Sequence, residues 1–218
     1  MSWRLDVLPP AQRAFWDGEA ERVPAHYVLY GGTAVALRYG HRQSVDFDFF
    51  TEAALDEPAL RAALPLLAGA IVLHRAPETL TVSVALAGEP VKLSFFAGIT
   101  FGRVGVPERH GPQPPLASPL DLLATKLKAL LERIEPKDYL DVEVLLRSGL
   151  SLEAGTAALR ALFGTAVNPL DVAKAVAWFR EGGLEARLPE GTRRYLTERA
   201  AAFQPPATAL PILSHRLT

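Results

Sequence analysis

The chain has 218 residues, 49% of them hydrophobic and 22% charged, and a formal net charge of −1, so it has no overall basic field that would attract nucleic acid. The absence of cysteine excludes disulfides, zinc–thiolate sites and thiol catalysis. No apolar run approaches the roughly 18 to 20 residues that cross a membrane, and the N-terminus has no signal-peptide pattern, so we expect a cytoplasmic protein without a membrane partner.

The predicted elements of the first half alternate between helices and strands. A helix follows Pro9-Pro10, and a strand, a glycine pair and a second helix occupy residues 26–30, 31–32 and 33–39. The next elements are a strand within 44–50, a helix over 57–67 and strands over 70–74, 79–86 and 91–96. We therefore predict a mixed α/β core over residues 1–115.

The second half is predicted to be helical. Prolines and glycines crowd residues 107–119, which indicates a linker or crossover loop. A helix start follows at Ser118-Pro119, and helices are expected over 136–146, 152–163, 169–180 (capped by Asn168) and 190–203. Residues 116–218 thus form a predicted helical C-terminal lobe that ends in an irregular, proline-rich tail.

Two carboxylates, Asp46 and Asp48, are spaced i and i+2 in the strand of residues 44–50. Alternate side chains of a strand share a face, so both carboxylates point the same way, while Phe47 and Phe49 point into a core. Like charges side by side repel, and a hard, oxygen-binding cation is the simplest reason to keep them. The alternative interpretation is a solvated face of an edge strand.

Upstream, Gly31, Gly32 and Thr33 stand between a strand and a helix. Glycines allow close approach of a ligand, and the first N–H groups and the dipole of a helix face an anion. By themselves the glycines also fit a simple tight turn. Together with the carboxylate pair they predict phosphoryl or nucleotidyl transfer with a divalent metal.

A third group of charged residues lies in the helical half. Lys126 and Arg133 are seven residues apart and share a helix face, and Asp138 and Asp141 are i and i+3 on the next helix. Lys126 is expected to contact a triphosphate and Asp138 to orient a positive group or the nucleotide. The alternatives are a lysine stem that covers the core and acids that the helix dipole favours.

These segments together resemble the AbiEii/AbiGii-type nucleotidyltransferase toxins of bacterial abortive-infection and toxin–antitoxin systems. The resemblance covers roughly residues 25–148 and rests on the glycine pair with Thr33, on the run Arg42-x-Ser44-x-Asp46-x-Asp48, and on the spacing of Lys126, Arg133, Asp138 and Asp141. It implies an α+β fold: a polymerase-β-like nucleotidyltransferase core with a short mixed sheet, followed by a helical lobe.

The resemblance also implies an activity, which is transfer of a nucleotide from an NTP with Mg²⁺ or Mn²⁺ as the metal. It assigns the metal to Asp46 and Asp48, catalysis to these two with Lys126 and Asp138, and phosphate or nucleotide contacts to Gly31, Gly32, Thr33, Ser44, Lys126 and Arg133. Asp141 and Arg42 are further candidates. The acceptor in such toxins is tRNA, and a cognate antitoxin protein is the implied partner. A local patch of Arg38, His41 and Arg42 is the expected contact surface for RNA.

One position departs from the pattern of the wider superfamily. A third carboxylate is expected on the strand of residues 91–96, and Ser94 stands at that position. A carboxylate there is the candidate base for the attacking hydroxyl. Two alternatives therefore remain beside the RNA-modifying toxin: a nucleotidyltransferase acting on a small molecule or a protein, and a non-catalytic binding module with the same fold.

Overall fold

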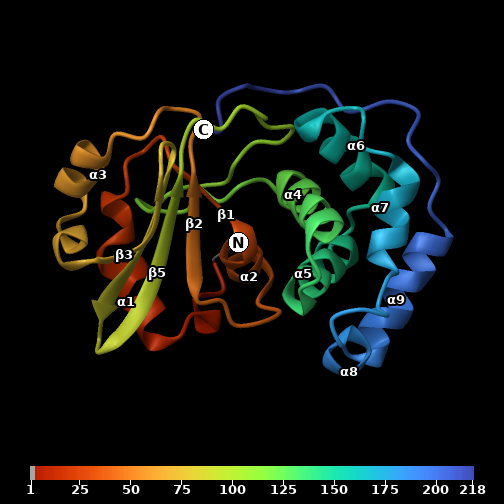
Figure 1. The fold of residues 1–218 in the computed structure, drawn as a ribbon, viewed down its shortest axis with the longest axis horizontal. Helices are drawn as coiled ribbons and strands as arrows, with labels where there is room; N and C mark the ends of the chain where they lie inside the picture. The colour runs from red at the N-terminus through yellow and green to blue at the C-terminus, as the bar shows by residue number, and fades with distance from the viewer. Residues whose placement is uncertain (1–2) are drawn as a thin grey trace. The chain divides into compact units, whose positions relative to one another are not determined.

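A computed structural model describes residues 3–218. Their internal contacts divide them into two compact units (Figure 1). The first unit runs to Gly102 and includes Val106–Ser118 and Ser214–Thr218, and the second consists of Arg103–Gly105 and Pro119–Leu213. Within residues 3–218, each helix is too short or too polar to span a bilayer.

A mixed sheet forms the centre of the first unit. Its strands in the described residues are β1 (Val28–Tyr30), β2 (Asp46–Phe50), β3 (Ile71–Ala76), β4 (Thr79–Leu86) and β5 (Glu89–Phe96), in the order β1-β2-β5-β4-β3. The pair β2–β5 is parallel, and the other three pairs are antiparallel. The predicted short mixed sheet is confirmed, and β2 is an interior strand rather than an edge.

Aromatic side chains fill the core on one face of this sheet. Helix α1 (Pro10–Gly18) brings Phe15 and Trp16 against Phe47, with ring centroids 4.8 and 6.1 Å apart. Phe49 stacks on Phe95 of β5 at 5.4 Å. All five side chains are at most 2% exposed, so the alternation expected of the β2 segment places its phenylalanines in the core.

The helix predicted over residues 57–67 is interrupted. Helix α3 spans Glu57–Ala63, and a 3₁₀ helix follows at Pro65–Gly69. Proline has no N–H for the α-helical ladder, and it disfavours the α conformation of the residue before it. Leu64 accordingly adopts φ −118° and ψ 82°. Pro65 therefore ends the α-helix and begins the 3₁₀ helix.

The proline-rich segment predicted as a linker is anchored to the sheet unit. The Leu29 N–H donates to the Pro115 carbonyl at 2.8 Å, and the Ala117 N–H donates to the Leu29 carbonyl at 2.9 Å. Leu116 is fully buried between them. This segment therefore lies beside β1 until helix α4 begins at Pro119.

The second unit is helical. Its helices in the described residues are α4 (Pro119–Glu132), α5 (Pro136–Arg147), α6 (Leu152–Phe163), α7 (Pro169–Val176), α8 (Leu184–Arg187) and α9 (Glu190–Ala201). Asn168 caps α7 as predicted by accepting from the Leu170 N–H at 3.1 Å. Helix α7 ends at Val176 instead of residue 180, and the Trp178 carbonyl accepts the Tyr139 hydroxyl at 2.9 Å. The short helix α8 was not predicted.

Helices α4 and α6 approach each other closely at Gly155. A Cβ atom on Gly155 would lie 2.5 Å from Leu123 Cδ2 and 3.0 Å from Leu127 Cδ1. Such distances are shorter than van der Waals contact, so a side chain at this position would require Leu123 to shift. Helix α4, which carries Lys126, packs against α5, α6 and α7 and so lies in the centre of the helical unit.

Candidate active site

Asp46 and Asp48 lie on one face of β2, opposite the buried Phe47 and Phe49. Both carboxylates are half-buried, as the alternating exposure of the strand requires. On the same face, Phe50 contacts Phe96 of β5, with ring centroids 4.8 Å apart. An interior strand with neighbours on both sides holds the two carboxylates on a rigid backbone.

Asp48 lies directly over the first turn of helix α2. Strand β1 pairs Tyr30 with Asp48, and α2 (Gly31–Tyr39) starts at the next residue. Gly31 has φ +71°, and a Cβ atom there would lie 2.5 Å from Asp48 Oδ2. The helix thus begins at the glycines and not at Thr33, and Gly31 is required both by its backbone conformation and by the carboxylate beside it.

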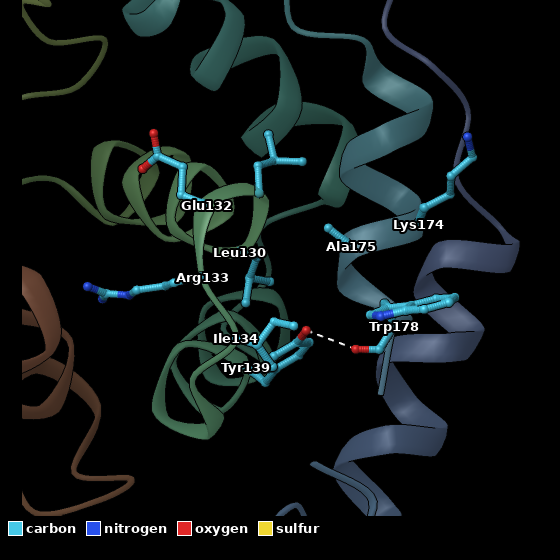
Figure 2. Close-up of a pocket in the computed structure, with 9 residues that line it drawn as sticks. Leu130, Glu132, Arg133, Ile134, Tyr139, Lys174, Ala175 and Trp178 are labelled. Carbon is cyan, nitrogen blue, oxygen red and sulfur yellow. Dashed lines mark hydrogen bonds between the residues drawn. The ribbon is translucent and has the colours of Figure 1, made fainter. Parts of the chain in front are cut away.

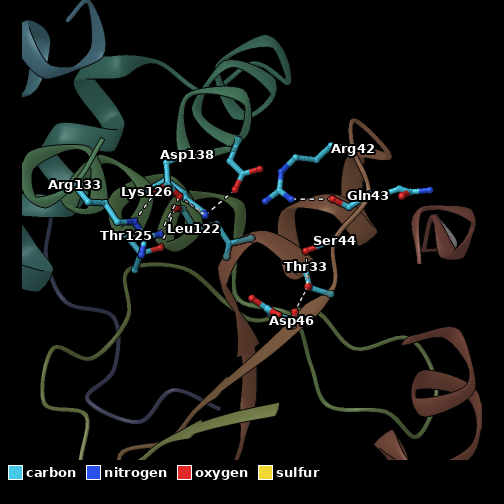
Figure 3. A network of polar contacts seen from close by, with 11 residues as sticks. Thr33, Arg42, Gln43, Ser44, Asp46, Leu122, Thr125, Lys126, Arg133 and Asp138 are labelled. Carbon is cyan, nitrogen blue, oxygen red and sulfur yellow. Dashed lines mark hydrogen bonds and ion pairs between the residues drawn. The ribbon is translucent and has the colours of Figure 1, made fainter. Parts of the chain in front are cut away.

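Thr33 and Ser44 support the backbone of Asp46 (Figure 3). Their hydroxyl oxygens are 2.7 Å apart, and the Thr33 hydroxyl donates to the Asp46 carbonyl. A hydroxyl has one proton, so Ser44 is the donor toward Thr33. Both side chains are buried. This arrangement gives them a structural task, and a direct phosphate contact by either stays a prediction.

Strand β5 adds two side chains beside the carboxylates. Its parallel register pairs Asp46 with Lys92 and Asp48 with Ser94. The Lys92 Nζ lies 3.3 Å from Asp46 Oδ2, and Ser94 is 2% exposed. Ser94 therefore occupies the neighbouring position expected from the sequence. Lys92 was missed there, although it is two residues before Ser94 and strand alternation places both on one face.

In the helical unit, Lys126 holds two buried carboxylates. Its Nζ lies 2.8 Å from Asp138 Oδ1 and 2.6 Å from Asp141 Oδ2. Both aspartates are fully buried, and the lysine side chain is 6% exposed. The cluster joins α4 to α5, and its charges are closely paired.

Arg133, just after α4, makes a two-pronged contact with Asp138. Its Nε and Nη2 donate to the two carboxylate oxygens at 2.8 and 3.2 Å. Burial alone would raise the pKa of Asp138, but the hydrogen bonds from Arg133 and the charge of Lys126 outweigh it and hold that pKa below its usual range. The Arg133 side chain remains 53% exposed, so this guanidinium is both oriented and accessible.

The patch predicted to contact RNA needs a correction at Arg38. Its side chain is only 9% exposed, and the guanidinium donates to the Glu108 carboxylate and, at 2.9 Å, to the Ala117 carbonyl. Arg38 therefore serves the packing of the proline-rich segment. Arg42 is half-buried and donates to the Gln43 carbonyl at 2.9 Å.

The carboxylate pair fits a divalent ion that arrives with other ligands. In the described part of the chain, no group of three or more His, Cys, Asp or Glu side chains is placed to hold a metal by itself. Mg²⁺ is usually bound through one or two carboxylates together with substrate phosphates and waters. Asp46 and Asp48 match that donor set. They lie beside the start of α2, where the absence of a side chain on Gly31 leaves room for the Asp48 carboxylate.

The helical unit also contains an apolar pocket of about 310 Å³ (Figure 2). Its volume is at the lower end of the range for small-molecule sites. Figure 2 shows Arg133 at its rim, pointing away from Trp178 and Tyr139. The lining residues are Leu130, Leu131, Glu132, Arg133, Ile134, Tyr139, Lys174, Ala175 and Trp178. Of the residues predicted for the active site, the pocket includes Arg133 alone.

Comparison with known proteins supports a family assignment. The profile of the family described as "Nucleotidyl transferase AbiEii toxin, Type IV TA system" matches residues 19–209. An uncharacterized protein of Aquifex aeolicus (strain VF5) is 32% identical over 124 residues, which are 56% of this chain. That match covers 58% of the relative's own length.

Two solved structures share the fold. JHP933 from Helicobacter pylori aligns with a TM-score of 0.55 at 18% identity, covering 84% of this chain and 85% of that chain. MenT4, a nucleotidyltransferase toxin of Mycobacterium tuberculosis H37Rv, aligns with a TM-score of 0.53 at 12% identity, covering 88% of this chain and 84% of that chain.

Proposed function

Because the chain belongs to the AbiEii family of nucleotidyl transferase toxins, we propose that it transfers a nucleoside monophosphate from an NTP to an RNA acceptor of the tRNA kind, with Mg²⁺ or Mn²⁺. The observation that carries this proposal is the placement of Asp46 and Asp48 on one strand face, with Asp48 directly over the start of α2. Carboxylates for a cation and helix N–H groups for phosphates meet at that point.

Asp46 and Asp48 would hold the divalent ion, and the first turn of α2 would receive phosphate oxygens of the NTP. The ion neutralises charge on those oxygens when it is bound. An acceptor hydroxyl oxygen forms a bond to the α-phosphorus, the bond from that phosphorus to the α–β bridging oxygen breaks, and pyrophosphate leaves. With Ser94 in the place of a third carboxylate, the hydroxyl proton passes to water or to one of the two aspartates.

In the helical unit, Arg133 is the cation that we assign to the triphosphate, because its side chain is half exposed and Asp138 holds it in two places. Lys126 keeps Asp138 charged and in position. A direct contact between Lys126 and the triphosphate, as predicted from the sequence, requires the lysine to leave one of its carboxylates. Lys126 is thus foremost a positioning residue in this proposal.

The decisive test is transfer of label from each of the four NTPs to total RNA, with Mg²⁺, with Mn²⁺ and with EDTA. We expect labelled RNA only with metal, and loss of most activity in Asp46→Asn and in Asp48→Asn. Both variants should fold, because each substitution relieves repulsion between the pair. Asp17→Asn is the matched control, since this aspartate is exposed and pairs with Arg13. Full activity of both site variants would contradict the proposed site.

A small-molecule or protein acceptor is the second candidate. It is favoured by the burial of Arg38, which removes one cation from the predicted RNA patch, and by the net charge of −1. In the same assay this candidate predicts label on a protein or on a small molecule and none on RNA. Binding of NTP with no labelled product of any kind would instead support a non-catalytic module.

A further inference from the structure

Lys92 is a cation inside a site that the proposed function describes by its anions. The ladder β2–β5 places it opposite Asp46, with its Nζ 3.3 Å from Asp46 Oδ2. Strand β4 pairs Ser83 with Lys92 and Thr81 with Ser94. Paired residues of neighbouring strands share a face, so the polar groups next to Lys92 on this face of β4 and β5 are the neutral hydroxyls of Ser83, Thr81 and Ser94.

The charges on this face limit how many metal ions it accepts. Asp46 and Asp48 contribute two negative charges, and Lys92 contributes one positive charge at short range. In a two-metal site the two ions lie about 4 Å apart, and each needs carboxylate ligands. Here a second ion would approach the ammonium, and Ser94 offers a neutral oxygen in place of a charged ligand.

We propose that Lys92 is a built-in cation of the active site: the site takes one divalent ion, which shares Asp46 with Lys92, and the ammonium supplies the second positive charge to the phosphates. This rests on the proposed nucleotidyl transfer. A lysine is a point charge on a flexible stem and suits that task. The side chain is 44% exposed and its bond to Asp46 is long, so little is lost when Lys92 turns toward a phosphate.

The test measures metal binding without turnover. Mn²⁺ alone is titrated into the wild-type chain and into Lys92→Met and Lys92→Arg, and the free ion is followed by electron paramagnetic resonance. Two unit charges about 4 Å apart in water correspond to roughly a five-fold change in affinity. We therefore expect Lys92→Met to bind Mn²⁺ at least about five-fold more tightly, with Lys92→Arg close to the wild type.

Two further measurements separate this role from that of an ordinary surface lysine. Without metal, Lys92→Met should unfold at a slightly lower temperature than the wild type, because Asp46 loses its ion-pair partner, and Mn²⁺ should restore the midpoint. In EDTA, the same variant should bind NTP more weakly. Lys128→Met, which removes a lysine paired with Glu132 on helix α4, should change neither quantity.

The outcomes are distinct from those of the transfer assay. Two Mn²⁺ ions per wild-type chain, or equal Mn²⁺ affinity in wild type and Lys92→Met, would overturn the role of Lys92 even if RNA is labelled. A chain that labels no acceptor but shows the expected Mn²⁺ and stability differences would keep the role of Lys92 as a competing cation and overturn the transfer reaction instead.

Discussion

Replacing Lys126 by Met is expected to destabilise the helical unit strongly. The ammonium lies 2.8 Å from Asp138 and 2.6 Å from Asp141, and both carboxylates are fully buried. Removing one partner of a buried ion pair costs about 3–5 kcal/mol, because an uncompensated charge remains. Since Arg133 still faces Asp138 in the variant, we take the lower end. In a unit of about 100 residues such as this one, 3 kcal/mol corresponds to a decrease of ~12–24 °C in the unfolding midpoint.

The assay is thermal unfolding of the wild type, Lys126→Met and Lys128→Met, followed by circular dichroism from pH 7 down to pH 3. Lys128 lies on the same helix, but it pairs with Glu132 at the surface, and such pairs contribute about 0–1 kcal/mol. Midpoints of the two variants within about 1 °C of each other would refute the reasoning. Selective loss of NTP binding by a stable Lys126→Met would indicate the direct triphosphate contact instead.

The pH series tests the direction in which the stability difference between the wild type and Lys126→Met changes. The pKa of Asp138 lies below its usual range in the folded chain, so the stability that this group contributes is complete above the ordinary value of about 3.9 and is lost as the pH falls through the lowered pKa. In Lys126→Met, Asp138 has lost one of its two cationic partners, and its protonation by acid removes part of the uncompensated charge. The difference between the wild type and Lys126→Met should therefore narrow below about pH 4. A constant difference across the series would contradict this assignment.

Three further predictions concern the sheet unit. Gly31→Ala should lower the unfolding free energy by at least about 1–2 kcal/mol, because Gly31 has φ +71° and the new Cβ would lie 2.5 Å from an Asp48 carboxylate oxygen. The control Gly69→Ala, with open space around the new Cβ, should not lower it. Equal denaturation midpoints of the two variants would contradict the close approach at Gly31. Ser94→Asp should preserve or raise labelling of the acceptor with Mg²⁺, because a general base adds about 10²–10⁴-fold at most; a folded variant without activity would count against the alignment of β5 with a three-carboxylate site. Burial, with Glu78 and Asp56 nearby, raises the pKa of Tyr27 to about 12, so stability should be complete below about pH 10 and fall as the pH rises toward 12, and Tyr27→Phe should abolish that part of the alkaline loss.

Much of the fold follows from local patterns in the chain. Alternation over the β2 segment is sufficient to place both carboxylates opposite Phe47 and Phe49, because side-chain direction in a strand depends only on the parity of position. The starts of α5 and α7 follow from proline and cap residues in the same way. The break between α3 and the 3₁₀ helix at Pro65 is also a local effect, because proline restricts the backbone of the residue before it.

The candidate site also depends partly on local sequence and partly on tertiary contacts. By itself, the sequence was sufficient to predict the candidate residues: a carboxylate pair, a glycine-rich helix start, and a group of Lys, Arg and Asp on two helices. Only the tertiary structure decided the partners of these groups. Lys92 meets Asp46 across 46 residues of chain, and Lys126 is enclosed between two carboxylates. Local periodicity predicts which face of a strand or helix is buried, but which residue of a distant segment lies opposite depends on how the segments pack.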